Sequence, residues 1–294
     1  MTDYMVRALS NSLNVIGLAG VTTGLVEEAR RIHGTSPTAS AALGRALTGG
    51  LFMGALLKRG QRVALKFEGN GPLKRIIVEA DHEGAVRGYV AVPEVYIPFK
   101  DEKLNVSGAL GSQGLLTVVK DVGLKEPYRG IVKLMTGEIG DDIAYYYAVS
   151  EQIPSAVGLG VFVNPDERIG AAGGFLIQSL PPADGALVDR LIENIRAIPS
   201  VTGLVKTGKT PEDILALIFS GISHHILEKK PLSYRCLCSR ERVERALISL
   251  GSEELQKLME EQENTEITCE YCCRIYYFEK QDLRALQTEI QMSR

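Results

Sequence analysis

The five cysteines of this 294-residue chain all lie near its C-terminus, and none precedes Cys236. Cys236 and Cys238 form a Cys-x-Cys pair, and after thirty intervening residues Cys269 and Cys272 form a Cys-x-x-Cys pair. Cys273 follows the second pair directly. Even scatter along the chain would rarely produce this distribution, so we predict that a small C-terminal segment depends on sulfur.

Two cysteine pairs at this spacing are typical of a zinc site. Zn²⁺ accepts a tetrahedral cage of four thiolates and demands no redox chemistry of the metal. The final segment, 233–294, is too short to bury a large core, so a bound metal would supply missing stability. Residues 239–261 are predicted to form two helices, with Ser239 and Ser252 as N-caps and Gly251 at the break. Such a hairpin would bring both pairs together, and the predicted zinc ligands are Cys236, Cys238, Cys269 and Cys272.

Two roles for this zinc site remain open from the residues alone. A catalytic zinc keeps a coordination position open for water, whereas four cysteines close the site. No H-x-E or H-E-x-x-H pattern accompanies the cysteines. The site is therefore either purely structural or a redox switch, because oxidation of zinc-bound thiolates would remove ligands and release the metal.

The first 180 residues mix short strands with helices. DYMVRAL and LNVIGLAG predict two strands, and helices are predicted over 22–34 and 38–58. RVALKFEG, LKRIIVEAD and AVRGYVAVP are separated by NGP and HEG turns and predict a meander. Later strands are predicted in GLLTVVKD, RGIVKLM, GLGVFVNP and GGFLIQSL, with a helix near DDIAYYYAVSEQ. Because βαβα alternation is not strict, we predict an α+β fold, with a core domain over 1–180.

A helical connector is predicted over 181–232, between the core domain and the C-terminal module at 233–294. Its first helix, ALVDRLIENIRAI, has an apolar stripe. A second helix begins near Pro211, which suits an early helical position. These apolar faces must be covered by another part of the protein. The residues of the stripe are Leu187, Val188, Leu191, Ile192 and Ile195.

Several other motifs are weaker than the cysteine pattern. GLVKTGKT (203–210) matches a phosphate-binding loop, but the amphipathic segment with Pro199 before it is not the buried strand that such a loop requires. His224 and His225 are predicted near the end of a helical segment, on different faces, which disfavours a metal role. AYYYAV (144–149) is predicted to pack in the core. With no nucleophile–His–acid set in evidence, we expect no enzymatic activity.

Charge and hydropathy narrow the possible partners. The formal net charge is −3, and residues 233–294 carry 9 Lys and Arg against 12 Asp and Glu. An acidic module disfavours nucleic acid, although a structural zinc module that binds nucleic acid is the main alternative function. The longest apolar stretch, 46–57, is too short for a membrane span, and the N-terminus lacks the features of a signal peptide. We therefore expect a cytoplasmic protein with no membrane partner.

Longer blocks of sequence accompany the cysteine pattern. They are CLCSRERVERAL, GNGPLKRIIVEADHEGAVRGYV, EPYRGIVKLMTGEIGDDIAYYYAVSEQIPSAVGLGVFVNPD and AAGGFLIQSLPPA. With these blocks, the chain resembles the 33 kDa heat-shock protein family, the redox-regulated chaperonins of bacteria, over nearly its whole length.

The resemblance implies a holdase, an ATP-independent chaperone that binds unfolding proteins under oxidative stress and passes them to ATP-driven foldases. It implies that the four ligands hold one zinc ion in the reduced, inactive state. On oxidation it implies disulfides Cys236–Cys238 and Cys269–Cys272, zinc release, unfolding of the module and a destabilised connector. It also implies a homodimer when active.

Cys273 departs from the family pattern, which does not usually place a cysteine after the fourth ligand. It is an inert neighbour, an alternative ligand or a competitor in disulfide exchange, and we interpret it as an inert neighbour. The surface that binds client proteins is not predicted.

Overall fold

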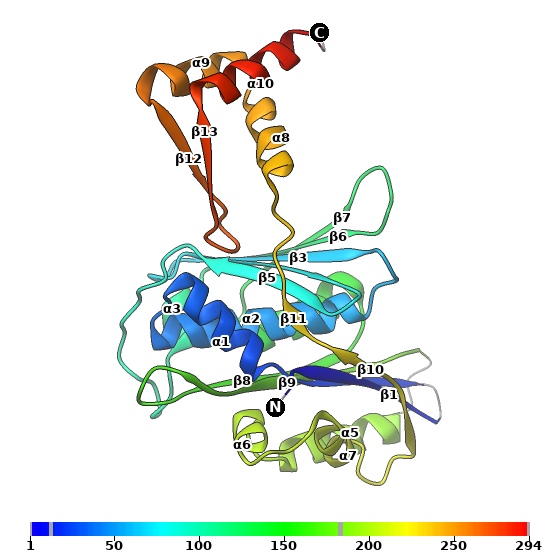
Figure 1. Cartoon of the computed structure of the whole chain (residues 1–294). Coiled ribbons are helices and arrows are strands. Elements are labelled where there is room, and N and C mark those ends of the chain that lie inside the picture. The colour runs from blue at the N-terminus through cyan, green and yellow to red at the C-terminus, as the bar shows by residue number, and fades with distance from the viewer. Residues whose placement is uncertain (1, 12–13, 182–184, 293–294) are drawn as a thin grey trace. The chain divides into compact units, whose positions relative to one another are not determined.

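The computed structural model describes residues 2–11, 14–181 and 185–292. The chain divides into two compact units, Met1–Arg235 and Cys236–Arg294 (Figure 1). Each unit has a hydrophobic core of its own. Within the described ranges, no helix combines the length and apolar character needed to cross a bilayer.

The first unit contains two β-sheets. The five-stranded sheet is antiparallel, in the order β10-β1-β2-β9-β8, and the six-stranded sheet has the order β11-β5-β4-β3-β6-β7. In the five-stranded sheet the strands are β1 (Tyr4–Ser10), β2 (Val15–Val21), β8 (Ser155–Val163), β9 (Ile169–Ser179) and β10 (His224–Pro231). In the six-stranded sheet they are β3 (Arg62–Gly69), β4 (Arg75–Asp81), β5 (Ala85–Val90), β6 (Gly114–Asp121), β7 (Tyr128–Lys133) and β11 (Ser233–Tyr234).

The predicted strands and the α+β class are confirmed. The meander is formed by β3, β4 and β5, which pair as consecutive antiparallel neighbours. In β3 the side chains of Val63, Leu65 and Phe67 are fully buried while those between them are more exposed, because successive side chains of a strand point to opposite faces.

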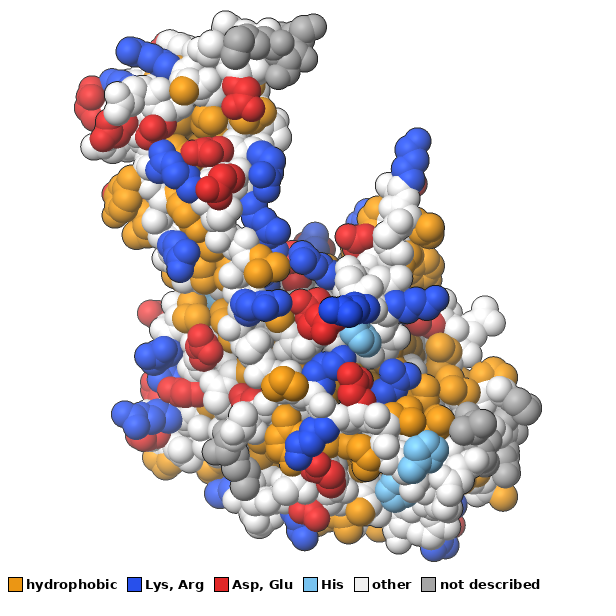
Figure 2. Space-filling view, turned by 45° about the vertical axis from the view of Figure 1, so that its right-hand side comes forward, with side chains coloured by type: hydrophobic (Ala, Val, Ile, Leu, Met, Phe, Trp, Pro, Cys, Tyr) orange, Lys and Arg blue, Asp and Glu red, His pale blue; other side chains and the backbone are white. Residues whose placement is uncertain are grey.

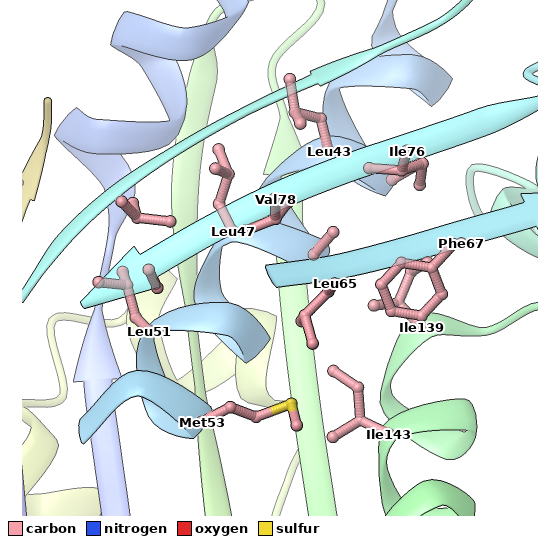
Figure 3. Close-up of a cluster of buried hydrophobic side chains, with 14 of the residues drawn as sticks. Leu43, Leu47, Leu51, Met53, Leu65, Phe67, Ile76, Val78, Ile139 and Ile143 are labelled. Carbon is pink, nitrogen blue, oxygen red and sulfur yellow. The ribbon is translucent and has the colours of Figure 1, made fainter. Parts of the chain in front are cut away.

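Helix α2 (Pro37–Ala55) lies between the two sheets and contacts β4 and β5 on one side and β8 and β9 on the other (Figure 1). Nearly all of its side chains are buried, because the helix is apolar on most of its faces and must be covered on all of them. Figure 3 shows Leu47 of this helix close to Val78 of β4. Gly50 allows the close approach, because a Cβ there would lie 2.7 Å from Cγ1 of Val78.

The remaining helices of the core are shorter. Gly34 follows the first of them in the left-handed region, at a φ of 59°, at the end of the helix predicted over 22–34. Tyr146 and Tyr147 are both buried, which confirms core packing for that part of AYYYAV, whereas Val149 is 53% exposed and the prediction is wrong there. The helices are α1 (Thr23–His33), α3 (Val106–Leu110), α4 (Ile139–Tyr146) and a π-helical turn, η1 (Tyr147–Glu151).

Three helices from the predicted connector pack against the five-stranded sheet. They are α5 (Gly185–Ala197), α6 (Val201–Lys206) and α7 (Pro211–Ile218), and they form a second cluster with side chains of β1, β2 and β9. Leu191 is buried, whereas Ile192 is 41% exposed, so the apolar stripe of α5 is narrower than predicted. Helix α7 begins at Pro211 as predicted, and Thr210 forms a capping box with Asp213.

The helical prediction at His224 and His225 is wrong. These residues begin β10, which pairs with β1 from Ser10↔His224 to Tyr4↔Pro231. Pairing with a strand more than two hundred residues away decides the local conformation, and no nearby sequence signal reports that partner.

The second unit combines three helices with a β-hairpin. Ser239 caps the first helix as predicted, but the predicted cap at Ser252 is wrong by one residue, because Gly251 is the N-cap and Ser252 opens the next helix. The elements are α8 (Arg240–Leu250), α9 (Ser252–Glu261), β12 (Asn264–Thr268), β13 (Ile275–Glu279) and α10 (Lys280–Met292). The buried core residues are Leu247, Leu255, Met259, Phe278, Leu283 and Leu286.

Candidate metal centre

The Cys-x-Cys pair lies in the short loop that precedes α8. Cys238 stands next to Ser239, whose side chain accepts a hydrogen bond from the Arg242 amide at 3.4 Å. This cap satisfies one of the unpaired amides at the start of the helix. The helix start therefore fixes the chain immediately after Cys238.

The Cys-x-x-Cys pair lies in the turn of the β12–β13 hairpin. The last ladder pair is Thr268↔Ile275, and beyond it the Cys269 amide donates to the Arg274 carbonyl at 2.9 Å. The Cys273 amide donates to the Cys269 carbonyl at 2.8 Å, and Cys273 has a φ of 55°. These bonds make a tight turn that holds Cys269 and Cys272 on one side of the hairpin end.

The structure brings the four predicted ligands together within the second unit. Their Sγ atoms all lie within 4.8 Å of one another. The Sγ atoms of Cys236 and Cys269 are 3.7 Å apart, and those of Cys238 and Cys272 are 3.3 Å apart. Tetrahedral zinc with Zn–S bonds of about 2.3 Å requires sulfur–sulfur separations of about 3.8 Å. The cluster therefore has the dimensions and donor set to hold a metal ion.

All five cysteines are thiols in the structure, and no disulfide joins any of them. The four clustered cysteines are half-buried, whereas Cys273 is exposed and lies outside the cluster. Cys273 has a left-handed backbone conformation because it lies in the hairpin turn. The turn needs this conformation whether or not the side chain carries sulfur.

Burial and mutual contacts shift the thiol pKa values in different directions. Burial raises the pKa of Cys269 and of Cys272, and for each a neighbouring thiol reinforces the effect. Burial also acts to raise the pKa of Cys238, but hydrogen bonds from Tyr276 and the neighbouring thiols outweigh it and lower the value to about 7. Of Cys238, Cys269 and Cys272, Cys238 is therefore the thiol that ionises most readily.

The sequence reasoning missed Tyr276, whose hydroxyl donates a hydrogen bond to Cys238 Sγ at 3.1 Å. The signal was available in the strand pattern. Tyr276 and Phe278 share one face of β13, Phe278 is fully buried, and Tyr277 on the other face is 56% exposed. Tyr276 is thus the residue of that face nearest the cysteine turn.

The other sequence candidates lie elsewhere. GLVKTGKT runs from inside α6 to the cap of α7, and α5 rather than a strand precedes it. His224 stacks on Phe219 at 4.7 Å, and His225 contacts Asn11. Among the described residues, the cysteine cluster is the one group of three or more potential ligands close enough to share a metal ion.

Comparisons with known proteins agree with this architecture. The family model described as Hsp33 protein matches residues 3–279. A "33 kDa chaperonin" of Geobacter sulfurreducens is 56% identical over 290 residues, covering 99% of this chain and 96% of that protein. One of Geobacillus kaustophilus is 46% identical over 288 residues, covering 98% of each.

A solved structure is also similar over its full length. The crystal structure of a 33 kDa chaperonin (heat shock protein 33 homolog) from Thermotoga maritima superposes with a TM-score of 0.91 at 35% identity, covering 100% of both chains. The match spans both units and the cysteine-bearing segment. The chain belongs to the Hsp33 family.

Proposed function

We propose that this protein is a redox-regulated, ATP-independent holdase chaperone that binds unfolding proteins under oxidative stress. Relatives named 33 kDa chaperonin support the chaperone assignment. The observation that carries the redox proposal is the cluster of four thiol Sγ atoms within 4.8 Å of one another. The four thiolates of Cys236, Cys238, Cys269 and Cys272 would hold one zinc ion in the reduced, inactive state.

Oxidation would convert the four thiols into two disulfides, Cys236–Cys238 and Cys269–Cys272. Each disulfide forms when two thiols give up two electrons and two protons, and one molecule of hydrogen peroxide is reduced to two of water. The shortest sulfur contacts described above join the two loops rather than residues of one loop. The within-loop pairing is supported by chain connectivity, because spacers of one and two residues keep each pair close after the loops separate.

Loss of the four-thiolate site would unfold the small C-terminal module. Its core contains six fully or nearly fully buried hydrophobic side chains, which is little for a unit of this size. When a metal site holds such a module together, the free energy of metal binding contributes directly to the free energy of folding. The bound metal would therefore stabilise the folded module, and oxidation of its ligands would remove that stabilisation.

Client proteins would bind to apolar surface that the connector covers in the reduced state. Leu191 of α5, Leu204 of α6, Ile214 of α7 and Phe219, which follows α7, are buried in one cluster with the five-stranded sheet. If this segment detaches, an apolar sheet face and apolar helix faces become exposed together, which is the kind of surface that unfolded proteins bind. We propose 1–180 as the core, 181–232 as the connector and 233–294 as the switch module, with β10 of the connector and β11 of the module paired in the sheets of the first unit.

The proposal extends to partners and location. We propose that the active form is a homodimer, that it passes clients to ATP-driven foldases, and that it works in the cytoplasm without membrane or nucleic-acid partners. A reducing compartment suits a site that must start as thiols. Figure 2 shows basic and acidic side chains interspersed over the face in view. A protein surface that binds nucleic acid usually has a continuous basic patch, so this mixture does not favour such binding. We propose no enzymatic activity.

The test is to measure zinc release and suppression of client aggregation in the same samples, before and after warm peroxide treatment. The proposal expects the reduced protein to hold one zinc ion and to leave aggregation unchanged. After treatment, zinc should be free and aggregation suppressed. If zinc leaves while chaperone activity does not change, the switch is wrong. Salt-dependent binding of nucleic acid would instead favour a structural zinc module with that function.

A further inference from the structure

One tyrosine holds the chain to the first unit just before the cysteines begin. Tyr234 lies in β11, and only Arg235 separates it from Cys236. Its side chain is buried, and its hydroxyl donates a hydrogen bond to the Gly88 carbonyl at 2.9 Å. The same oxygen lies 3.0 Å from Nε2 of His33 and, because its own proton goes to Gly88, accepts from that nitrogen. We call the buried ring and these two hydrogen bonds the Tyr234 anchor.

The backbone of β11 makes few hydrogen bonds of its own. The strand is two residues long and lies at one edge of the six-stranded sheet, beside β5. The Ser233 amide donates to the Gly84 carbonyl at 3.0 Å. The Arg235 amide donates to the Val86 carbonyl at 2.8 Å. Because so short an edge strand frays easily, the buried Tyr234 side chain carries much of the attachment.

The anchor lies, along the chain, between the two segments that the proposed function releases. The connector ends with β10, whose last residue is Pro231, and the ligands of the module begin at Cys236. Strand β10 is itself an edge strand, and Ile226 and Leu227 are nearly half exposed, so burial of these side chains contributes little to holding it. Once β11 is free, β10 can separate from β1 one pair at a time, starting at Tyr4↔Pro231.

We propose that Tyr234 is a gate between the loss of zinc and the release of the connector. When the module unfolds, disorder begins at Cys236 and reaches β10 along the chain only after β11 has left β5. Opening of β11 breaks both hydrogen bonds of the phenol and exposes its ring to water. These contacts therefore set how readily loss of the metal is followed by release of the connector. This inference rests on the proposed function and names a residue that regulates it.

The test compares Tyr234→Phe with Tyr146→Phe in the full chain. Both tyrosines are buried in the same core, and the Tyr146 hydroxyl donates to Glu151 at 2.7 Å. The control therefore loses a buried tyrosine's hydrogen bond from α4 instead of β11. Zinc is removed by peroxide in one series and by a chelator under reducing conditions in the other. Hydrogen exchange with peptide resolution then follows α7 and β10 of the connector and β3 and β4 of the core.

Loss of the Tyr234 hydroxyl removes both hydrogen bonds of the anchor and should raise the population of open β11 about tenfold. After zinc removal, amides of α7 and β10 should therefore exchange about tenfold faster in Tyr234→Phe than in the wild type. The rate of zinc release, and exchange in β3 and β4, should stay within about twofold of the wild type in both variants. Oxidised Tyr234→Phe should suppress client aggregation at a lower temperature than the oxidised wild type.

Three results would overturn the inference. One is unchanged exchange in the connector of Tyr234→Phe, including the case in which the wild-type connector opens fully as soon as zinc leaves. Another is an equal acceleration in Tyr146→Phe, because that reports a general loss of core stability. The third is faster zinc release from Tyr234→Phe, which would place the effect within the module and not after its unfolding.

The two series separate this inference from the proposed function. If peroxide does not release zinc from the wild type, the proposed redox switch fails. The chelator removes the metal without oxidation, so the comparison of the two variants in that series still decides the role of Tyr234.

Discussion

The guanidinium carbon of Arg240 lies 4.3 Å from the centroid of the Phe278 ring. The same side chain donates from Nη1 to the Tyr277 carbonyl at 2.7 Å and from Nη2 to Asp282 at 2.8 Å. Arg240 is two residues after Cys238, so it ties the loop of the first cysteine pair to the strand that follows the second pair. This contact outside the sulfurs therefore helps to hold the two cysteine-bearing loops together.

Arg240→Ala should weaken the C-terminal module and, through it, zinc affinity. The lost cation–π contact and the partly exposed ion pairs are worth about 1–2 kcal/mol together. Because metal binding and folding are coupled, we expect zinc affinity to fall about tenfold, measured by competition with a chromogenic chelator. Arg242→Ala, an exposed arginine on the same helix, is the control and should leave the affinity within about twofold. Equal affinities for both variants would contradict this account.

Cys273→Ser should leave one tightly bound zinc ion, because Cys273 is exposed and lies outside the four-sulfur cluster. Cys272→Ser should abolish tight binding, since removal of one sulfur opens the closed site. Zinc content of the two purified variants, measured by atomic emission, distinguishes them. Loss of zinc from Cys273→Ser would show that the wrong sulfur had been assigned.

Removal of zinc by a chelator under reducing conditions should unfold Cys236–Arg294 and leave the two-sheet unit folded. The module has a small core and the sheet unit a large one, so their dependence on the metal differs. Hydrogen exchange with peptide resolution is the measurement. Amides of α8, α9 and α10 should lose protection, while those of β3 and β4 should keep it. If the amides of the whole module kept their protection after zinc removal, the metal would not be what stabilises its fold.

Phe219→Ala should expose apolar surface without oxidation. Phe219 is fully buried, and a Cβ added to Gly17 of β2 would lie 2.6 Å from its ring, so the contact between α7 and the sheet is tight. Truncation of a buried phenylalanine costs about 3–5 kcal/mol. We expect client aggregation to be suppressed under reducing conditions with zinc still bound. Leu217→Ala, at a side chain that is 38% exposed, should behave as the wild type.

A reduced, zinc-bound Phe219→Ala protein that does not suppress aggregation would contradict the proposed role of the connector. An increase in fluorescence of a hydrophobic dye, compared with Leu217→Ala, shows independently whether the apolar surface has become accessible.

Local signals predicted much of the fold. The turns around RVALKFEG and its neighbouring runs identified β3, and Pro211 identified the start of α7. These features need no distant partner, because a strand face and a helix cap are set by nearby residues. The cysteine spacing predicted the cluster in the same way, since two tight loops each carry a pair.

Features set by distant pairing were not predictable. His224 and His225 form a strand only because the edge of β1 is available to them. The N-cap predicted at Ser252 was wrong by one residue. Gly251, at a φ of 90°, is both the C-cap of α8 and the N-cap of α9. Tyr276 was missed because its importance depends on where Cys238, 38 residues earlier, meets the hairpin.

The central claim is that four cysteines hold one zinc ion and release it by becoming two disulfides. Native mass spectrometry of the full chain along a peroxide titration, with peptide mapping of each sample, measures this most directly. The account predicts one zinc ion per reduced chain, and zinc loss that parallels formation of Cys236–Cys238 and Cys269–Cys272 while Cys273 stays a thiol. Zinc retained by the fully oxidised chain, or zinc lost with no disulfide formed, would contradict it.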